Sequence, residues 1–473
     1  MSLAVQSVVQ QMFCGDEVKA CVVDMGSSQC RFGFAGQDVP RYRFRSDVGL
    51  VAAESSSSSN KSVRSGGVED ASCMQVDGQA STATAKAAGA SPDGSHSRYL
   101  CGDQSLRYIR DDVEIMRPFT HAADGAASIN WDAVEQLLAY GTGQQMAVDP
   151  REYPLLFAEN DFRSTKDKSA LLELAFEKMD APASWIASSA ALAAFSSGRT
   201  TAMVVDVGAS GTRVQPVVDG YALHKAEVRT TRGGNAHDAL VDAALAAAGV
   251  EVRPWFEASS SSASSSCAAD LRSLHRADVV RDVKKWMSFV PYVPVPPASR
   301  HKFITDVIKL PPFELPDGTL VRHDDALCTG AEALFFAEST TGVATALAKP
   351  VLGLPAHQQP LALDEEAAPL SELLRAALLR SDVDARKDLL GNTCLVGGGA
   401  LIDGLQQRLQ LQSSATFPAH MKCKVQMQLP EERLNAAWIG GSILGICGSF
   451  QQMWISKQEW LEYGDTLFTH RLH

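Results

Sequence analysis

At 473 residues the chain is long enough for two or more domains, because a single hydrophobic core rarely grows beyond about 250–300 residues. Hydrophobic residues make up 45% of the chain and charged residues 21%, which excludes a protein dominated by disorder. The formal net charge of -12 argues against DNA binding through a broad basic face and favours basic partners.

Ten cysteines are scattered along the chain, and no two form a C-x-x-C pair. This spacing indicates neither a zinc ribbon nor a dithiol redox site. The N-terminal VQSVVQQMF stretch is short and has no basic flank, so we expect neither a secretory signal nor a membrane span. We therefore expect a soluble intracellular protein with reduced thiols, several of them buried.

The first regular segment is Val18–Gly36, in which two apolar runs flank a polar break. This pattern predicts two antiparallel strands joined by a turn at Asp24–Ser27. An acid that leaves a buried strand can hold the water shell of a divalent cation, Gly26 lets backbone N–H groups approach an anion, and Ser27 adds a hydroxyl donor. The turn is therefore a candidate phosphate site.

Two segments of the N-terminal half are expected to lack regular structure. Residues 1–17 are predicted to be a flexible extension. Residues 50–98 are rich in Ser, Ala and Gly and contain few large apolar side chains, so we expect a disordered insertion. Because loops tolerate added length, a neutral insertion is the simplest interpretation.

Strands and helices are predicted to alternate between residues 129 and 214. Apolar spacing or alanine content predicts helices at Ile129–Tyr140, Lys166–Met179 and Ser184–Phe195, and a buried strand at Pro154–Phe157. Met203–Val214 then repeats the first hairpin, with an acid, Asp206, and a glycine, Gly208, at its turn. One such turn is a weak indication of a phosphate site, whereas two in separate halves of the chain are a much stronger one.

The second half of the chain is predicted to be mainly helical, with glycine turns. Helices are expected at Ala236–Ala248 and Leu271–Phe289, a Ser-rich insertion at 256–268, and a turn at Leu315–Thr319. The glycine cluster Gly397–Gly399 follows the strand-like Asn392–Val396 and is expected to open the helical stretch ALIDGLQQRLQ. A glycine-rich turn into a helix N-terminus suits an anion or a nucleotide.

With these motifs the chain resembles the actin-related proteins. The two phosphate hairpins of that family are similar to DMGSSQCRFGFAGQDVPRYRF and VVDVGASGT. Four further segments occur in family order: NWD, SGRTTAMVVD, VVRDVKK and WIGGSILGICGSFQQMWISKQEW. The resemblance covers nearly the whole chain apart from the extension and the two Ser-rich insertions. It implies an actin-like α/β fold, in which two lobes are each built on a ribonuclease-H-like mixed five-stranded sheet and four subdomains surround a nucleotide cleft.

The resemblance also implies lobe boundaries and a ligand. The small lobe would comprise residues 18–196 and 435–473, and the large lobe residues 197–434. ATP, with Mg or Ca, would lie between them, and Asp24 and Asp206 would be near the metal. The nucleotide residues that the family motifs imply are Asp24, Gly26, Ser27, Arg31, Asp206, Gly208, Lys284, Gly397 and Gly398. At Arg31 the family usually has lysine, which has a different contact geometry.

Four departures from the family pattern occur at positions that the family uses for hydrolysis or nucleotide binding. Ser189 stands where the family has a glutamine that orients the attacking water, and serine is too short for that task. Ala209 replaces an acid of the second hairpin, Arg213 replaces a histidine, and Lys285 replaces the acid that contacts the ribose. Because phosphoryl transfer depends on positioning the water, we expect no useful hydrolysis. ATP would be at most a structural ligand, and an empty cleft is the alternative.

The resemblance places four apolar residues at a groove that receives partner helices. These residues are Phe195, Leu444, Cys447 and Met453. The alternative is that they belong to the core around a C-terminal helix, because apolar helical spacing usually means burial. In nuclear members of the family the groove helps to receive a long helix of a remodelling ATPase, often beside actin, and a helix in an apolar groove is a common recognition mode.

Three functions are compatible with these sequence features. The first is a non-catalytic nuclear subunit of chromatin-remodelling or histone-acetyltransferase complexes, most like the fourth actin-related class. It would bind a remodeller helix, actin, other subunits and histone tails, with no membrane contact and no strong direct DNA binding. The replaced filament loop at 50–98, the Met-x-x-Asp-Gly echo within Cys73–Gly78 and the missing glutamine favour it. The others are a cytoskeletal ATPase that forms or caps filaments, and a phosphotransferase or chaperone-like ATPase.

Overall fold

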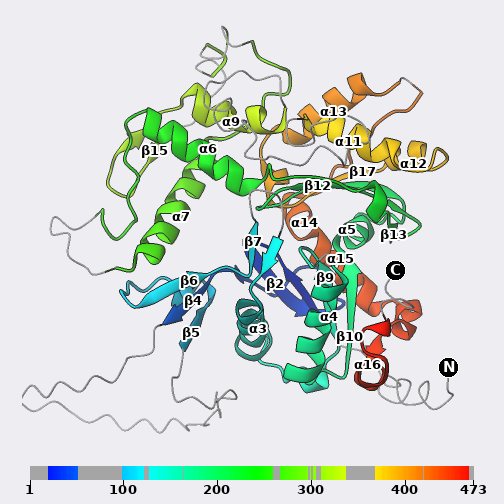
Figure 1. Ribbon diagram of the computed structural model, residues 1–473. Coiled ribbons are helices and arrows are strands. Elements are labelled where there is room, and N and C mark those ends of the chain that lie inside the picture. The colour runs from blue at the N-terminus through cyan, green and yellow to red at the C-terminus, as the bar shows by residue number, and fades with distance from the viewer. Residues whose placement is uncertain are drawn as a thin grey trace, which may run out of the picture.

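The computed structural model describes ten parts of the chain. These are residues 20–51, 98–121, 127–162, 164–258, 267–296, 299, 302–304, 311–336, 368–418 and 420–467. The predicted extension, the motif at Cys73–Gly78 and the greater part of both Ser-rich insertions lie outside them. Figure 1 shows two separate sheets, each with helices packed around it.

One part of the molecule, which we call the small lobe, is built on a six-stranded sheet with the order β18-β10-β9-β1-β2-β3. Its strands are β1 Cys21–Met25, β2 Gln29–Phe34, β3 Tyr42–Arg45, β9 Leu155–Glu159, β10 Ala183–Ser188 and β18 Ile455–Ser456. β1 is antiparallel to β2 and parallel to β9, which is parallel to β10. The five longer strands form the expected sheet, and the two-residue β18 adds an edge.

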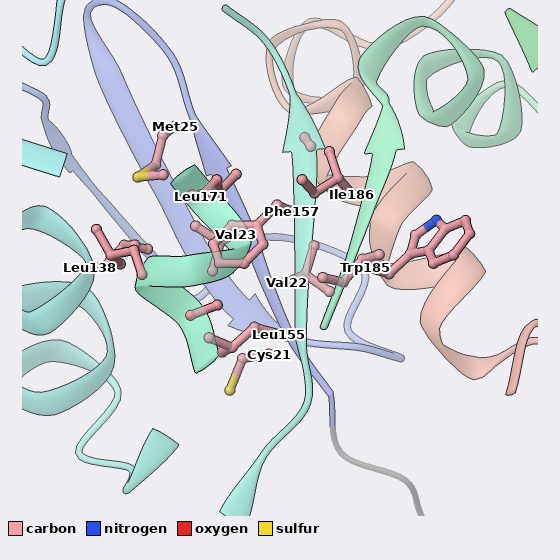
Figure 2. Close-up of a cluster of buried hydrophobic side chains, with 14 of the residues drawn as sticks. Cys21, Val22, Val23, Met25, Leu138, Leu155, Phe157, Leu171, Trp185 and Ile186 are labelled. Carbon is pink, nitrogen blue, oxygen red and sulfur yellow. The ribbon is translucent and has the colours of Figure 1, made fainter. Parts of the chain in front are cut away.

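β1 lies in the middle of the small-lobe core, with all five of its residues buried. Figure 2 shows side chains of this core on neighbouring strands, among them Val22, Phe157 and Trp185. A strand buried on both faces reads as a continuous apolar run, which explains why Cys21–Met25 does not alternate. Asp24 is the polar exception, and its burial requires bonded partners.

The second part, the large lobe, is built on a five-stranded sheet with the same local arrangement. Its strands are β11 Ala202–Val207, β12 Thr212–Val218, β13 Tyr221–Ala222, β14 Val228–Thr230 and β17 Thr393–Val396. The order is β13-β12-β11-β17, and β14 also pairs with β12. β11 is antiparallel to β12 and parallel to β17, as β1 is to β2 and β9. Both predicted hairpins and the two-lobed actin-like fold are therefore confirmed.

Further strands and helices surround the two sheets. The strands are β4 Val48–Val51, β5 Arg98–Cys101, β6 Val113–Met116, β7 Phe119–His121, β8 Ala127–Ile129, β15 Phe313–Glu314 and β16 Leu320–Val321. The helices are α2 Gly102–Ser105, α3 Trp131–Ala139, α4 Thr165–Glu173, α5 Ser189–Ser196, α6 Gly234–Ala247, α7 Ala269–Met287, α9 Asp325–Phe335, α11 Leu370–Leu379, α12 Arg386–Gly391, α13 Leu405–Thr416, α14 Pro430–Leu434, α15 Ala436–Ile446 and α16 Lys457–Tyr463. The lobe boundaries implied by the resemblance stay a prediction.

Two sequence predictions need correction. The expected helix Ser184–Phe195 is wrong in its first half, because β10 ends at Ser188 and α5 begins at Ser189. Trp185 and Ile186 suit a strand, and pairing with β9 places this half in the sheet. The helix expected directly after the glycine cluster begins only with α13. Residues Gly398–Leu401 form a 3₁₀ turn, and Gly404, with a φ of 80°, is the N-cap residue of α13.

Helices α5 and α15 pack against each other where the two sheets meet (Figure 1). α5 connects β10 of one sheet directly to β11 of the other. The helices approach so closely that a Cβ atom at Gly440 would lie 1.8 Å from the carbonyl oxygen of Leu192. The glycine in WIGGSILG is therefore required by backbone contact between these helices, which fixes how the lobes are joined.

The lobes also touch on the side away from α5 and α15, where α7 lies beside the three-stranded sheet β5-β4-β6 (Figure 1). An apolar cluster there contains Leu271 and Leu274 of α7 together with Val51, Leu100, Leu106 and Val113. Arg45 Nη2 donates to Asp278 Oδ2 at 2.9 Å, and the Ala268 amide donates to the Arg110 carbonyl at 2.7 Å. We call this set of residues the rim contact.

The cysteines behave as expected in the part of the chain that the structure describes. Each of the eight cysteines there lies outside any disulfide, and six of them are buried. Burial raises the pKa of Cys21 and of Cys30 to about 12, so both remain protonated at neutral pH. Within these described residues, no helix combines the length and the apolar character needed to cross a bilayer.

Candidate functional site

A cavity of about 700 Å³ lies between the two sheets. Both hairpin turns, the glycine cluster after β17 and the facing sides of α6 and α7 line it. All nine residues that the sequence assigned to a nucleotide line this cavity: Asp24, Gly26, Ser27, Arg31, Asp206, Gly208, Lys284, Gly397 and Gly398. The fold thus brings together residues more than 350 positions apart in the sequence.

The two hairpin turns face each other across the cavity. The Ser27 hydroxyl lies 3.0 Å from the Ser210 hydroxyl and 3.2 Å from Asp161 Oδ2. The amides of Gly26 and Gly208 close their own turns by donating to the Gln29 and Gly211 carbonyls at 3.0 and 2.9 Å. The amides of Gly26 and Gly208 are thus used within the turns, and Ser27 and Ser210 present hydroxyl groups at the facing turns.

Asp24 is buried at the end of β1 and is held from two sides. Arg31 Nη1 donates to its Oδ2 at 2.9 Å, and Asn160 Nδ2 donates to its Oδ1 at 2.5 Å. β1 and β2 place Asp24 and Arg31 directly opposite each other in the ladder. Arg31 Nε also donates to Asn435 at 2.9 Å, so Arg31 connects the first hairpin to the N-terminus of α15.

Asp206 lies near the end of β11 and lines the cavity. Burial raises the pKa of this carboxyl above its ordinary value, the positive charge of Arg213 opposes that rise, and the negative charge of Asp24 adds to it. A Cβ atom at Gly397 would come within 2.5 Å of Asp206 Oδ1, and Gly397 has a φ of 93°. Only glycine therefore satisfies both the backbone and the space at this turn.

Lys284 and Lys285 on α7 point to different partners. Lys284 Nζ lies 2.5 Å from Asp238 Oδ1 and donates to the Gly234 carbonyl at 3.2 Å, so its charge is tied to α6. Burial lowers the pKa of Lys284, and Asp238 opposes this. Lys285 instead pairs with Asp282 at 3.1 Å, with 66% of its side chain exposed.

The sequence as a whole can be placed by comparison with known proteins. The model of the family described as "Actin" matches residues 15–473. The chain belongs to the actin family. It is 29% identical over 472 residues to actin-related protein 4 of Yarrowia lipolytica, covering 96% of both chains. It is 30% identical to the proteins of the same name from Oryza sativa subsp. indica and Arabidopsis thaliana, covering 96% of this chain and 98% of each relative. The family resemblance seen in the motifs is confirmed.

Two of the departures from the actin pattern lie in contact. Ser189 is the first residue of α5 and is buried. Arg213 Nη1 donates to the Ser189 hydroxyl at 3.0 Å, and Nη2 donates to the Asn160 carbonyl at 3.1 Å. The resemblance predicted that Ser189 stands in place of a glutamine and Arg213 in place of a histidine. It did not predict that these two side chains contact each other. In this actin-family chain the side chains of Arg213 and Ser189 are hydrogen-bonded to each other.

The metal prediction for Asp24 and Asp206 is not tested by the structure. Among the described residues no cluster of three or more His, Cys, Asp or Glu side chains is arranged to hold a metal ion. Both oxygens of Asp24 already accept hydrogen bonds. A cation at this actin-like site would therefore take its remaining ligands from water and phosphate oxygens.

The four residues of the predicted partner groove are not equally available. Phe195, Leu444 and Cys447 are half-buried and pack against the small-lobe core. Met453 is 43% exposed, and Ile446 on α15 is 58% exposed. For the first three, packing against the core is in keeping with the alternative noted from the sequence. The groove itself stays a prediction.

Sequence reasoning missed three residues of the cleft. Asn160 follows β9, at the same sheet edge as the first hairpin turn, where residues after parallel strands meet. Asp238 lies one turn into α6, and its role depends on the packing of α6 against α7. His237 beside it is buried, and burial together with the charge of Lys284 lowers its pKa to about 3, so it is neutral. The segment Glu159–Asp161 after a buried strand was the one available signal.

Proposed function

We propose that the chain is a non-catalytic nuclear actin-related subunit of chromatin-remodelling or histone-acetyltransferase assemblies, with ATP as a structural ligand between its lobes. The similarity to proteins named actin-related protein 4 over 96% of the chain supports this proposal. The chromatin role rests on the resemblance to the nuclear fourth class. The pairing of Arg213 with Ser189 is the observation that carries the non-catalytic part.

The cleft suits a ligand with several negative charges. Eight basic side chains and five carboxylates line the cavity, in a chain whose formal net charge is -12. Gly397 and Gly233 leave backbone close to backbone where a Cβ would clash. We propose that Ser27 and Ser210 hold the phosphates. Bound ATP would supply the charge that joins the two turns and would stabilise the folded chain by mass action.

Hydrolysis needs a side chain that positions water in line with the terminal phosphate. Ser189 cannot reach such a water, and the guanidinium of Arg213 donates to the serine hydroxyl and holds it in place. The charge of Arg213 beside Asp206 would favour a bound triphosphate without helping a nucleophile to attack. ATP in this cleft would therefore remain intact.

The purified chain supplied with ATP and Mg is expected to release phosphate only at the background rate. Loss of the water-positioning group costs orders of magnitude in rate, which steady-state phosphate measurements resolve. Asp206→Ala is the matched control, because it alters the same cavity wall. Phosphate release well above background that disappears in Asp206→Ala would contradict the non-catalytic proposal and would favour an active ATPase.

The partner part of the proposal predicts a complex with a long amphipathic helix of a remodelling ATPase, alone or together with actin. Size-exclusion chromatography of the full chain with such a helix is expected to show a single early-eluting species. Replacement of the exposed Met453 by glutamate should weaken that complex if the groove is used. No complex with or without actin would speak against the nuclear assignment, and ATP-dependent sedimentation of filaments would support the cytoskeletal alternative.

A further inference from the structure

The cavity lacks a carboxylate at two positions where the family pattern has one. The side chain of Ala209 offers no acceptor, and Lys285 presents an ammonium group that pairs with Asp282. Three of the five carboxylates that line the cavity, Asp24, Asp161 and Asp206, belong to the hairpin end. A hydroxyl-bearing ligand that extends from the hairpins toward α6 and α7 therefore needs an acceptor from another residue.

Asp238 on α6 is placed to be that acceptor. It lines the cavity, and its side chain is 17% exposed. Its Oδ1 lies 2.5 Å from Lys284 Nζ, and its Oδ2 lies 3.6 Å from Arg281 Nε. Lys284 is itself anchored by the carbonyl of Gly234 at the start of the same helix. The carboxylate is thus held between two cations of α7.

This arrangement leaves acceptor capacity on the carboxylate. An ionised carboxylate has about four lone-pair sites, and Lys284 occupies only part of them. The ion pair offsets the cost of placing the charge at a partly buried wall. The two cations fix the Asp238 side chain before a ligand binds. A ligand hydroxyl that donates to Asp238 would therefore bind without the entropy cost of ordering that side chain.

We propose that Asp238 accepts a hydrogen bond from a sugar hydroxyl and makes the cleft selective for ribonucleotides over deoxyribonucleotides. The inference rests on the proposed binding of ATP and adds the residue that reads its sugar. This role of Asp238 also gives a reason for its ion pair with Lys284, because the lysine orients the Asp238 carboxylate. Asp238 is a binding residue, whereas Lys284 positions it.

The test compares the dissociation constants of ATP, 2′-deoxy-ATP and 3′-deoxy-ATP, measured by calorimetry on the full chain. The wild type is expected to bind ATP about 10- to 100-fold more tightly than at least one deoxy analogue, as for a hydrogen bond to a charged group. Asp238→Asn should reduce that ratio to less than about 3-fold, because an amide oxygen is a weaker acceptor than a carboxylate. The ratio is independent of any change in phosphate binding caused by the unpaired Lys284, since all three ligands carry the same triphosphate.

Asp242→Asn is the matched control. Asp242 lies one turn further along α6, pairs with Arg276 and is outside the set of residues that line the cavity. The Asp242→Asn variant should therefore show the same ratio of dissociation constants between the deoxy analogues and ATP as the wild type. If Asp238→Asn does not fold, the double variant Asp238→Asn with Lys284→Met removes both charges and should show the same loss. Equal affinities for ATP and both deoxy analogues in the wild type, or an unchanged ratio in the variants, would overturn the role of Asp238. Failure to bind all three nucleotides would instead overturn the proposed ATP ligand.

Discussion

Replacing Arg408 with methionine is expected to lower the free energy of unfolding by about 3–5 kcal/mol, the largest loss we expect from one substitution outside the cleft. Arg408 on α13 is fully buried, and its Nη1 lies 2.9 Å from Glu332 Oε1 of α9. The same nitrogen donates to the Pro291 carbonyl at 2.9 Å, and the guanidinium lies 5.1 Å from the centre of the Phe336 ring. Methionine would keep the packing but leave the Glu332 carboxylate buried without this cation.

Urea denaturation followed by circular dichroism measures this loss. Arg375→Met is the control, because Arg375 pairs with Glu372 across one turn of α11 with 42% of its side chain exposed, and a surface pair contributes only about 0–1 kcal/mol. Adding Glu332→Leu to Arg408→Met should recover most of the stability, since a buried pair can be replaced by apolar groups. An Arg408→Met protein as stable as the wild type would show that the pair does not hold α9 to α13.

The sequence was sufficient to predict the elements that depend on local patterns. Both hairpins and the positions of Asp24 and Asp206 beside their turns follow from apolar runs and turn residues. These features are determined by residues that are close together in the sequence, so a short stretch of sequence is enough to predict them. The cluster of all nine predicted cleft residues followed from family order and not from periodicity.

What the sequence did not predict depends on packing between distant segments. The strand β10 reads as part of a helix until its pairing with β9 is known. The contact between Arg213 and Ser189 joins β12 of the large lobe to the first residue of α5. The role of Asp238 appears only when α6 and α7 are side by side. In each case a tertiary contact decides the outcome, and no local preference contains it.

Truncation of Leu274 to alanine is expected to speed the release of bound nucleotide about 30-fold. We expect a ligand between the two sheets to leave when the lobes separate, and α5 and α15 join the lobes at one side. The rim contact closes the other side, where Leu274 is 5% exposed within an apolar cluster. Opening exposes this side chain to water, so removing it favours the open state by about 2 kcal/mol, and about 1.4 kcal/mol corresponds to tenfold.

Release of a fluorescent ATP analogue after a chase with unlabelled ATP, followed by stopped flow, measures this rate. Arg276→Ala on the same helix is the matched control, because Arg276 bonds Asp242 of α6 within the large lobe and leaves the rim contact unchanged. Asp278→Ala removes the ion pair with Arg45 across the rim and should accelerate release in the same direction but less, as its side chain is 26% exposed. Wild-type release rates in both Leu274→Ala and Asp278→Ala would mean that nucleotide leaves without parting the rim, and the cleft would then open by a movement that leaves α7 on its sheet.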